Sequence, residues 1–366
     1  MTAPLDPLAG LSAETFLAAH WQRAPCVRRQ ALPTNLLGAI SPEDLAAAAR
    51  DGDVESRVMI GPDDAGRFRV EYGPLEVDVS DRSTPWTLLV NQMDLKNDAA
   101  DTVLNAFDFV GRWRLEDLMV SYAVPGGSVG AHRDQYDVFL VQAVGRRRWQ
   151  FESQPGEDAP RAGEHGYALV DAFAPDQDVV LEPGDWLYLP PGCAHHGVAL
   201  DPCLTWSVGL RTPSGPELWA GFADYRLTHE AAPPRLADPH RSEGLAGAIC
   251  AADIREVRQL LGGVTRFSDA ELARWFGCLM TGQEPPEPAE EAIGNTLQRQ
   301  PGARTAWYAD RDACWLFAAG EALEASPSDA QLLAGQRTLG RLDLEQLDQP
   351  ALVEQLLDLG TFRWTD

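Results

Sequence analysis

The sequence predicts an α+β protein with an antiparallel β core, a helical segment and a small terminal α+β domain. Three observations lead to this fold class. Short segments rich in β-branched and aromatic residues follow one another closely over residues 115–211, with Gly and Pro turns between them. Beyond residue 214, apolar residues recur at spacings of three and four, as in amphipathic helices. Beyond residue 292, strand-like and helix-like segments are mixed.

The first 110 residues predict short helices and strands. The segment SPEDLAAAAR predicts a helix, because Ser41 can cap its free amides and Pro42 suits its first turn. Glu43 and Asp44 favour the positive end of the helix dipole. Strands are predicted at three segments that are bounded by Gly, Asp and Pro: SRVMI, RFRVEY and TPWTLLVNQMD.

The β core is predicted from four segments: LEDLMVSYAV, YDVFLVQAVGRRRWQFE, DVVLEPGDWLYLPPG and CLTWSVGLR. Several short strands at such close spacing indicate a sandwich or jelly roll rather than a βαβ fold. The region therefore forms a small all-β core.

The second half of the chain sets the expected domain boundaries. Helices are predicted at ELWAGFADYRLTHEAA, LAGAICAADIREVRQLLGG and SDAELARWFGCLM, followed by the Pro/Glu-rich linker TGQEPPEPAEEA. The remaining residues predict a domain of about winged-helix size. We expect domains at residues 1–213, 214–285 and 286–366. The apolar stripes of the middle segment exceed what a small barrel needs as cover, which predicts a homodimer interface.

Charge and composition exclude several classes of function. A formal net charge of −25 leaves no excess of Lys and Arg for binding nucleic acid or an anionic membrane. An acidic surface suits a cationic partner or serves solubility alone. The six cysteines include no Cys-x-x-Cys pair, and the chain shows neither a signal peptide nor eighteen consecutive apolar residues. These features predict a cytoplasmic protein with reduced thiols.

The stretch GSVGAHRDQYDVF contains the first candidate site. His132 and Asp134 are two residues apart, so in extended chain both face one side and can reach one metal ion, while Arg133 points away. A coincidental His-x-Asp pair, joined only by a hydrogen bond, explains the same spacing.

The stretch EPGDWLYLPPGCAHHGV contains the second candidate part of a metal site. The double proline ends strand pairing and turns the chain, which can aim a following histidine across the barrel. His195 and His196 point in opposite directions in extended chain, so one of them is the expected ligand, and spacing leaves open which. Two imidazoles and one carboxylate form the facial triad of non-haem Fe(II) oxygenases, and the ligand types also fit a catalytic zinc.

The stretch GRRRW contains a candidate anion-binding residue. Iron sites of this kind use a dicarboxylate co-substrate, and arginine binds a carboxylate through two parallel hydrogen bonds. Strand alternation puts Arg147 on one face and Arg146 and Arg148 on the other. A solvated basic edge is the alternative.

Four segments together resemble the Jumonji-C ribosomal oxygenases, closest to the bacterial members that hydroxylate arginine: FLAAHWQRAPCVRRQAL, DLMVSYAVPGGSVGAHRDQYDVFLVQAVGRRRWQF, LEPGDWLYLPPGCAHHGVAL and GFADY. The resemblance is dense over the catalytic domain, moderate over the helical segment and thin over the last seventy or so residues. It implies a double-stranded β-helix of the cupin type, a helical dimerisation segment and a C-terminal winged-helix-like domain.

The resemblance also implies roles for individual residues. In the family a histidine two residues after PPG is a ligand, so His132, Asp134 and His195 would bind Fe(II). Arg147 would bind the carboxylate of 2-oxoglutarate, assisted by Ser121. Two positions depart from the family: Thr205 stands where Asn is frequent and His196 where Glu is common.

The implied activity is that of an Fe(II)- and 2-oxoglutarate-dependent dioxygenase. With O2, it would hydroxylate the β-carbon of an arginine in a basic large-subunit ribosomal protein. The alternatives are a hydroxylase or demethylase of another residue or basic protein, a cupin isomerase, which leaves Arg147 unexplained, and a non-catalytic ligand-sensing regulator. Such a regulator would bind DNA through its terminal domain, but the predicted helix SDAQLLAGQRT contains one Arg and no Lys, so we expect no direct DNA binding. The negative net charge likewise predicts no membrane binding.

Overall fold

The protein is described by a computed structural model that covers residues 5–63, 66–156, 161–162, 168–170, 173–229, 235–236, 249, 251–264, 267–282, 294–311 and 313–365. The chain divides into two compact units, Met1–Thr212 with Gln300–Gly302 and Pro213–Arg299 with Ala303–Asp366. The boundary expected at residues 285/286, and most of the expected linker, lie outside the described residues. The three-domain organisation therefore stays a prediction.

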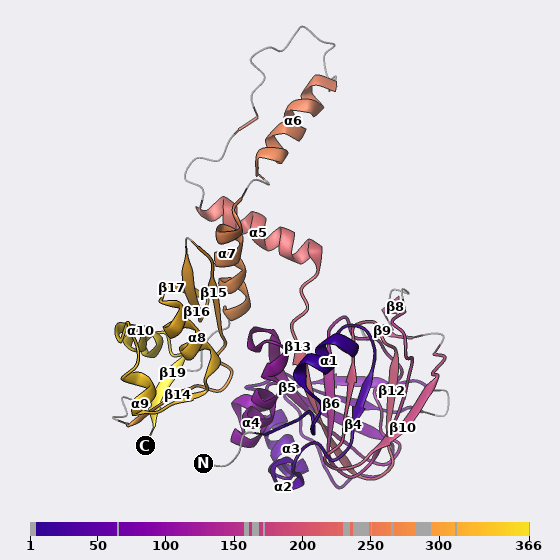
Figure 1. Ribbon diagram of the computed structural model, residues 1–366. Coiled ribbons are helices and arrows are strands. Elements are labelled where there is room, and N and C mark those ends of the chain that lie inside the picture. The colour runs from indigo at the N-terminus through magenta and orange to yellow at the C-terminus, as the bar shows by residue number, and fades with distance from the viewer. Residues whose placement is uncertain are drawn as a thin grey trace. The chain divides into compact units, whose positions relative to one another are not determined.

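Two antiparallel sheets form the first unit (Figure 1). The large sheet has the order β1-β11-β6-β13-β5-β4-β2-β3 and contains β1 (Cys26–Arg28), β2 (Ser56–Ile60), β3 (Arg69–Tyr72), β4 (Trp86–Val90), β5 (Leu115–Ala123), β6 (Val138–Val144), β11 (Trp186–Leu189) and β13 (Cys203–Leu210). The small sheet has the order β10-β7-β12 and contains β7 (Arg147–Phe151), β10 (Gln177–Leu181) and β12 (His195–Ala199). A two-residue pair, β8 (Arg161–Ala162) and β9 (Ala168–Leu169), completes the strands of this unit. The predicted antiparallel β core is confirmed.

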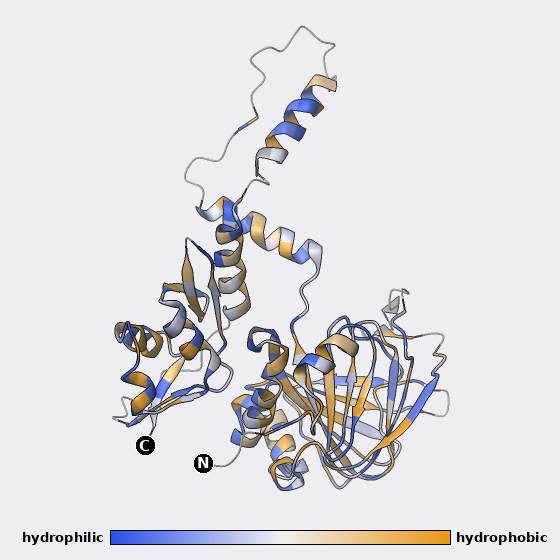
Figure 2. Ribbon diagram, viewed as in Figure 1, coloured by the Kyte–Doolittle hydropathy of each residue, from blue (hydrophilic) through white to orange (hydrophobic). Residues whose placement is uncertain are grey.

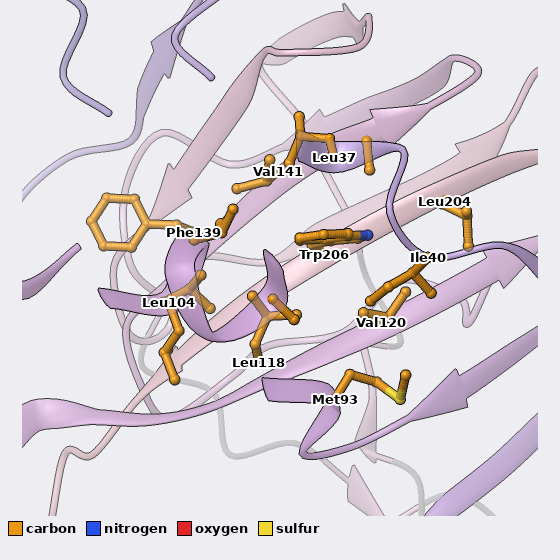
Figure 3. Close-up of a cluster of buried hydrophobic side chains, with 14 of the residues drawn as sticks. Leu37, Ile40, Met93, Leu104, Leu118, Val120, Phe139, Val141, Leu204 and Trp206 are labelled. Carbon is orange, nitrogen blue, oxygen red and sulfur yellow. The ribbon is translucent and has the colours of Figure 1, made fainter. Parts of the chain in front are cut away.

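The largest hydrophobic core lies between the large sheet and the helices that cover one of its faces. These helices are α1 (Ala13–Ala19), α2 (Thr34–Leu37), α3 (Pro42–Asp51) and α4 (Asp98–Ala106), with 3-10 turns η1 (Met93–Leu95), η2 (Asp108–Val110) and η3 (Arg112–Arg114). Alternate residues of β13, Leu204 and Trp206 among them, face this core, where they pack with Leu104 and Leu118 (Figure 3). The residues between them, Thr205 among them, therefore face the opposite side of the sheet.

Helix α3 forms as its sequence predicts. The Ser41 hydroxyl accepts a hydrogen bond from the Asp44 amide at 3.1 Å, and the Asp44 carboxylate accepts one from the Ser41 amide at 2.8 Å. This capping box satisfies amides that have no partner inside the helix. Gly52, with φ +72°, ends the helix in the left-handed region that glycine tolerates.

The second unit contains helices α5 (Gly215–His229), α6 (Ala251–Val264) and α7 (Asp269–Thr281), in the three segments predicted as helices. Residues 230–232 and 245–248 of the predicted helices lie outside the described residues. It also contains two three-stranded sheets, β18-β14-β19 and β15-β16-β17. The further elements are β14 (Thr296–Arg299), β15 (Thr305–Ala309), β16 (Cys314–Ala318), β17 (Glu321–Glu324), α8 (Pro327–Gly335), β18 (Thr338–Leu339), α9 (Arg341–Leu344), α10 (Ala351–Asp358) and β19 (Phe362–Thr365). Figure 2 shows both hydrophilic and hydrophobic residues along α6. Across the described ranges, no helix is long and apolar enough to cross a membrane.

Candidate active site

His132, Asp134 and His195 meet at one point of the first unit. His132 follows the turn after β5, and His195 begins β12. Their backbones form an isolated antiparallel bridge: the His132 amide donates to the His195 carbonyl at 3.0 Å, and the His195 amide donates to the His132 carbonyl at 2.9 Å. The Gly192 amide donates to the Asp134 carbonyl at 2.8 Å. The chain turn after Pro190 and Pro191 is therefore fixed against the His-x-Asp segment.

The three side chains have the geometry of a metal-binding triad. Each offers one ligand atom, and these atoms all lie within 4.8 Å of one another. An Asp134 oxygen lies 3.6 Å from His195 Nε2, and the other lies 3.9 Å from His132 Nε2. This cluster brings together the three residues that the sequence singles out as ligands.

Hydrogen bonds to backbone carbonyls orient both imidazoles. His132 Nδ1 lies 3.0 Å from the Gly130 carbonyl, and His195 Nδ1 lies 3.0 Å from the Cys193 carbonyl. A carbonyl can only accept, so both rings carry their proton on Nδ1 and present Nε2 as the electron-pair donor. Burial, with a further effect from His132, lowers the pKa of His195 to about 4. His195 is therefore neutral at pH 7, which is the form that binds a metal.

His196 lies away from the triad. It is half-buried, and its ring meets the Phe173 ring at a centroid distance of 6.1 Å, almost at right angles. Two consecutive strand residues point to opposite faces, which explains why only one of the two histidines is in the triad.

A cavity of about 270 Å³ opens beside the triad, and residues of both sheets line it. Its polar and charged lining residues include Arg57, Glu116, Asp117, Ser121, His132, Asp134, Arg147, His195, Thr205 and Ser207. Its apolar lining includes Leu89, Met119, Val138, Leu140 and Trp149. We refer to this space as the active-site cavity.

Arg147 lies buried in the wall of the active-site cavity. Its Nη1 donates to Ser121 Oγ at 3.3 Å and to Thr205 Oγ1 at 3.2 Å. Its Nε has no hydrogen-bond partner in the described ranges. Among the described residues no carboxylate forms an ion pair with it, and burial lowers its pKa. A buried charge without a counter-charge is costly, so this site favours an anionic ligand.

The neighbouring arginines are surface residues. Arg146 pairs with Asp201 at 2.8 Å, and Arg148 pairs with Asp178. The predicted alternation along GRRRW is thus present: Arg147 is 4% exposed, whereas both neighbours are about half exposed.

Carboxylates line another part of the active-site cavity. Glu116 pairs with Arg211 at 2.7 Å, and Asp117 accepts a hydrogen bond from the Gln92 amide at 3.1 Å. Asp117 and Trp149 also line the cavity but were not predicted from the sequence. Trp149 carries a usable signal, because it is two residues from Arg147 on one strand and so faces the same side. The sequence gives no such signal for Asp117, because a strand that starts with Glu-Asp is equally typical of a solvent-exposed edge.

Comparisons with known proteins agree with this geometry. The JmjC domain family matches residues 102–218. The ribosomal protein uL16 3-hydroxylase of Escherichia coli is 35% identical over 282 residues, which cover 75% of this chain and 74% of that protein. A probable ribosomal oxygenase of Haemophilus influenzae is 35% identical over 270 residues, which cover 69% of this chain and 63% of that protein.

Solved structures of E. coli YcfD match almost the whole chain. One has a TM-score of 0.81 at 30% sequence identity and covers 97% of this chain and 98% of its own. Another, of YcfD as a ribosomal oxygenase in complex with cobalt and 2-oxoglutarate, has a TM-score of 0.78 with the same coverage. The first unit therefore has the JmjC cupin fold, and the chain belongs to the JmjC ribosomal oxygenase family.

Proposed function

We propose that this protein is an Fe(II)- and 2-oxoglutarate-dependent oxygenase that hydroxylates the β-carbon of an arginine in large-subunit ribosomal protein uL16. One observation carries the proposal. The active-site cavity joins a His/Asp/His cluster to a buried arginine that forms no ion pair with any described carboxylate. A metal site with open positions and a receptor for a carboxylate are the two requirements of this chemistry.

His132, Asp134 and His195 would hold the metal. Two neutral imidazoles and one carboxylate suit Fe(II), and as three ligands they leave coordination positions for co-substrate and O2. The bound iron, with 2-oxoglutarate and O2, supplies the oxidising power for an unactivated C–H bond, while 2-oxoglutarate is converted to succinate and CO2. The carbonyl contacts of the two Nδ1 atoms keep both imidazoles aimed at the ion.

Arg147 would bind the distal carboxylate of 2-oxoglutarate. Its guanidinium forms charge-assisted hydrogen bonds with a carboxylate, and the low polarity of the surroundings strengthens them. Ser121 and Thr205 hold Nη1 in place, so that Ser121 assists this contact and Thr205 does the same from the adjacent strand. The YcfD complex with cobalt and 2-oxoglutarate supports this choice of co-substrate.

The substrate side chain would enter past Asp117. A carboxylate in the active-site cavity can pair with a guanidinium, and Met119 beside it offers an apolar surface for the arginine methylenes. The E. coli relative is named as a 3-hydroxylase of ribosomal protein uL16, and carbon 3 of an amino acid is its β-carbon. The net charge of −25 favours encounter with a strongly basic substrate protein.

The second unit would serve dimerisation rather than nucleic-acid binding. Helix α6 exposes Ile254, Val257 and Leu261 at helical spacing. An apolar groove of about 650 Å³ lies at α5 and α7, lined by Trp219, Phe222 and Trp275 among others. Such faces suit a homodimer of a cytoplasmic enzyme, with a winged-helix-like domain that makes no direct contact with DNA.

The test is an assay of the purified enzyme with Fe(II), 2-oxoglutarate and ascorbate. A basic uL16 peptide is compared with the same peptide carrying Lys in place of the target Arg. A product heavier by about 16 Da is expected only on the arginine peptide. Hydroxylation of both peptides, or of a histidine alone, would contradict the arginine assignment.

A further inference from the structure

Trp149 lies buried in the wall of the active-site cavity with an unused hydrogen-bond donor. It is on β7, two residues after Arg147, and is 4% exposed. Within the part of the chain that the structure describes, its Nε1 has no hydrogen-bond partner. Buried donors are normally paired, so an unpaired one beside a cavity indicates an acceptor that is present in the working enzyme.

The indole bridges the two ends of the proposed co-substrate site. Its ring centroid lies 5.9 Å from that of His195, and the Arg147 guanidinium carbon lies 5.4 Å from the ring. A dicarboxylate that spans the triad and Arg147 must therefore pass along Trp149. Arg147 Nε, on the same strand face, is likewise an unpaired buried donor.

Gly197 of the adjacent strand fixes the position of the indole. A Cβ at Gly197 would lie 2.6 Å from Cη2 and Cζ3 and 2.9 Å from Cε3 of Trp149, so the six-membered ring rests directly on the glycine backbone. The glycine backbone thus packs against one face of the ring, and any side chain at this position would displace the indole.

We propose that Trp149 is a binding residue for 2-oxoglutarate, in which its indole N–H donates a hydrogen bond to a co-substrate oxygen and its ring packs against the co-substrate methylenes. This inference rests on the proposed function. It adds to Arg147 a second, neutral donor from the same strand.

Trp206 is a matched control within the same chain. Its Nε1 is also buried without a partner, and its side chain is fully buried. It lies in the hydrophobic core on the other face of the large sheet, however, and does not line the active-site cavity (Figure 3). Replacing either tryptophan by Phe removes a buried indole, so any general effect of that loss will appear in both variants. An effect on 2-oxoglutarate binding is expected only for Trp149→Phe.

The first test uses the wild-type protein with ¹⁵N-labelled tryptophan, loaded with diamagnetic Zn(II). The sequence holds eleven tryptophans, so the indole N–H signals can be followed individually during addition of 2-oxoglutarate. We expect the signal that is missing from Trp149→Phe to move downfield, and the signal missing from Trp206→Phe to stay. If no indole signal moves downfield while 2-oxoglutarate binds, the inference is wrong, whether or not the variants fold.

The second test measures the 2-oxoglutarate Kd of the Zn(II) protein by calorimetry. Trp149→Phe should weaken binding about tenfold, because a hydrogen bond to a charged acceptor is lost. Trp206→Phe should leave the Kd unchanged, and the Zn(II) affinity should be equal in all three proteins. If Trp149→Phe binds 2-oxoglutarate with an unchanged Kd, the role of Trp149 is wrong, but the proposed function is unaffected. A wild-type protein that binds no 2-oxoglutarate overturns the proposed function.

Discussion

At the scale of single residues, strand alternation accounts for most of what the sequence predicts about the site. It separates Arg147 from Arg146 and Arg148, and His195 from His196, as the structure has them. Alternation does not reveal which face is the inner one. That choice rests on the resemblance to the family for both His195 and Arg147.

Arg147→Ala should raise the 2-oxoglutarate Kd roughly 30- to 150-fold, or about 2–3 kcal/mol, because a charge-assisted contact in a water-poor cavity is lost. Arg146→Ala should change the Kd little, because that side chain pairs with Asp201 at the surface. Calorimetry with a redox-inert metal measures both. Equal effects of the two substitutions would favour a diffuse electrostatic contribution over a specific receptor.

His132→Ala and Asp134→Ala should each abolish 2-oxoglutarate turnover and reduce metal affinity by orders of magnitude, while the circular dichroism spectrum stays that of the wild type. The reason is that both side chains border a cavity, so their truncation leaves the packed core intact. His196→Ala is the matched control and should retain metal binding. Loss of metal in His196→Ala but not in His195→Ala would reverse the ligand assignment.

Asp94 makes stability depend on pH. It is 2% exposed and accepts a hydrogen bond from the Leu118 amide at 2.9 Å. Burial, then Asp117 and Asp101, raise its pKa to about 7. The folded state thus holds a proton that the unfolded state, with a pKa of about 4, releases. Stability falls as pH rises between these two values and is lowest, for this group, above pH 7.

Asp94→Asn removes the cost of ionising this buried carboxyl but retains an acceptor for Leu118. The variant should gain stability relative to wild type as pH rises from 5 to 8, by an amount on the order of a few kcal/mol. Urea unfolding at the two pH values measures the gain. A pH-independent difference for Asp94→Asn would refute the assignment.

At the scale of elements, the sequence predicts the helices and strands that form because of their own residues. Helix α3 follows from its own capping residues, and the strands of the large sheet other than β1 follow from their β-branched and aromatic composition. Strands β1 and β12 were missed. HHGVA follows a Pro-Pro-Gly turn and has no strong strand preference, and it is a strand because all five residues pair with β7. Non-local pairing of this kind leaves little trace in a single segment.

Helix α6 gives a prediction at this scale. Leu261 is 61% exposed within the apolar stripe that we assign to a homodimer interface. Leu261→Glu should shift a dimer toward monomer, because a charge would be buried at the interface. Light scattering at micromolar concentration measures the mass. Leu342→Glu, at an exposed leucine of α9, should leave it unchanged. A wild-type monomer would remove the dimer proposal without affecting the chemistry.

At the scale of the whole molecule, composition predicted the need for more than one core but not how the chain is divided. The helices after residue 214 group with the terminal sheets in one compact unit, and Gln300–Gly302 group with the first. Such grouping depends on contacts between distant segments. The net charge of −25 predicts which partners the surface favours, but it does not predict the fold.

The central claim is that this protein adds one oxygen atom to an arginine of uL16. The most direct measurement is intact and peptide mass spectrometry of ribosomal proteins from cells with and without the gene. We predict a mass increase of about 16 Da on uL16 in cells that have the gene, located to the β-carbon of one arginine and absent without the gene. Identical uL16 masses in the two strains, or an added oxygen on a histidine only, would contradict the account.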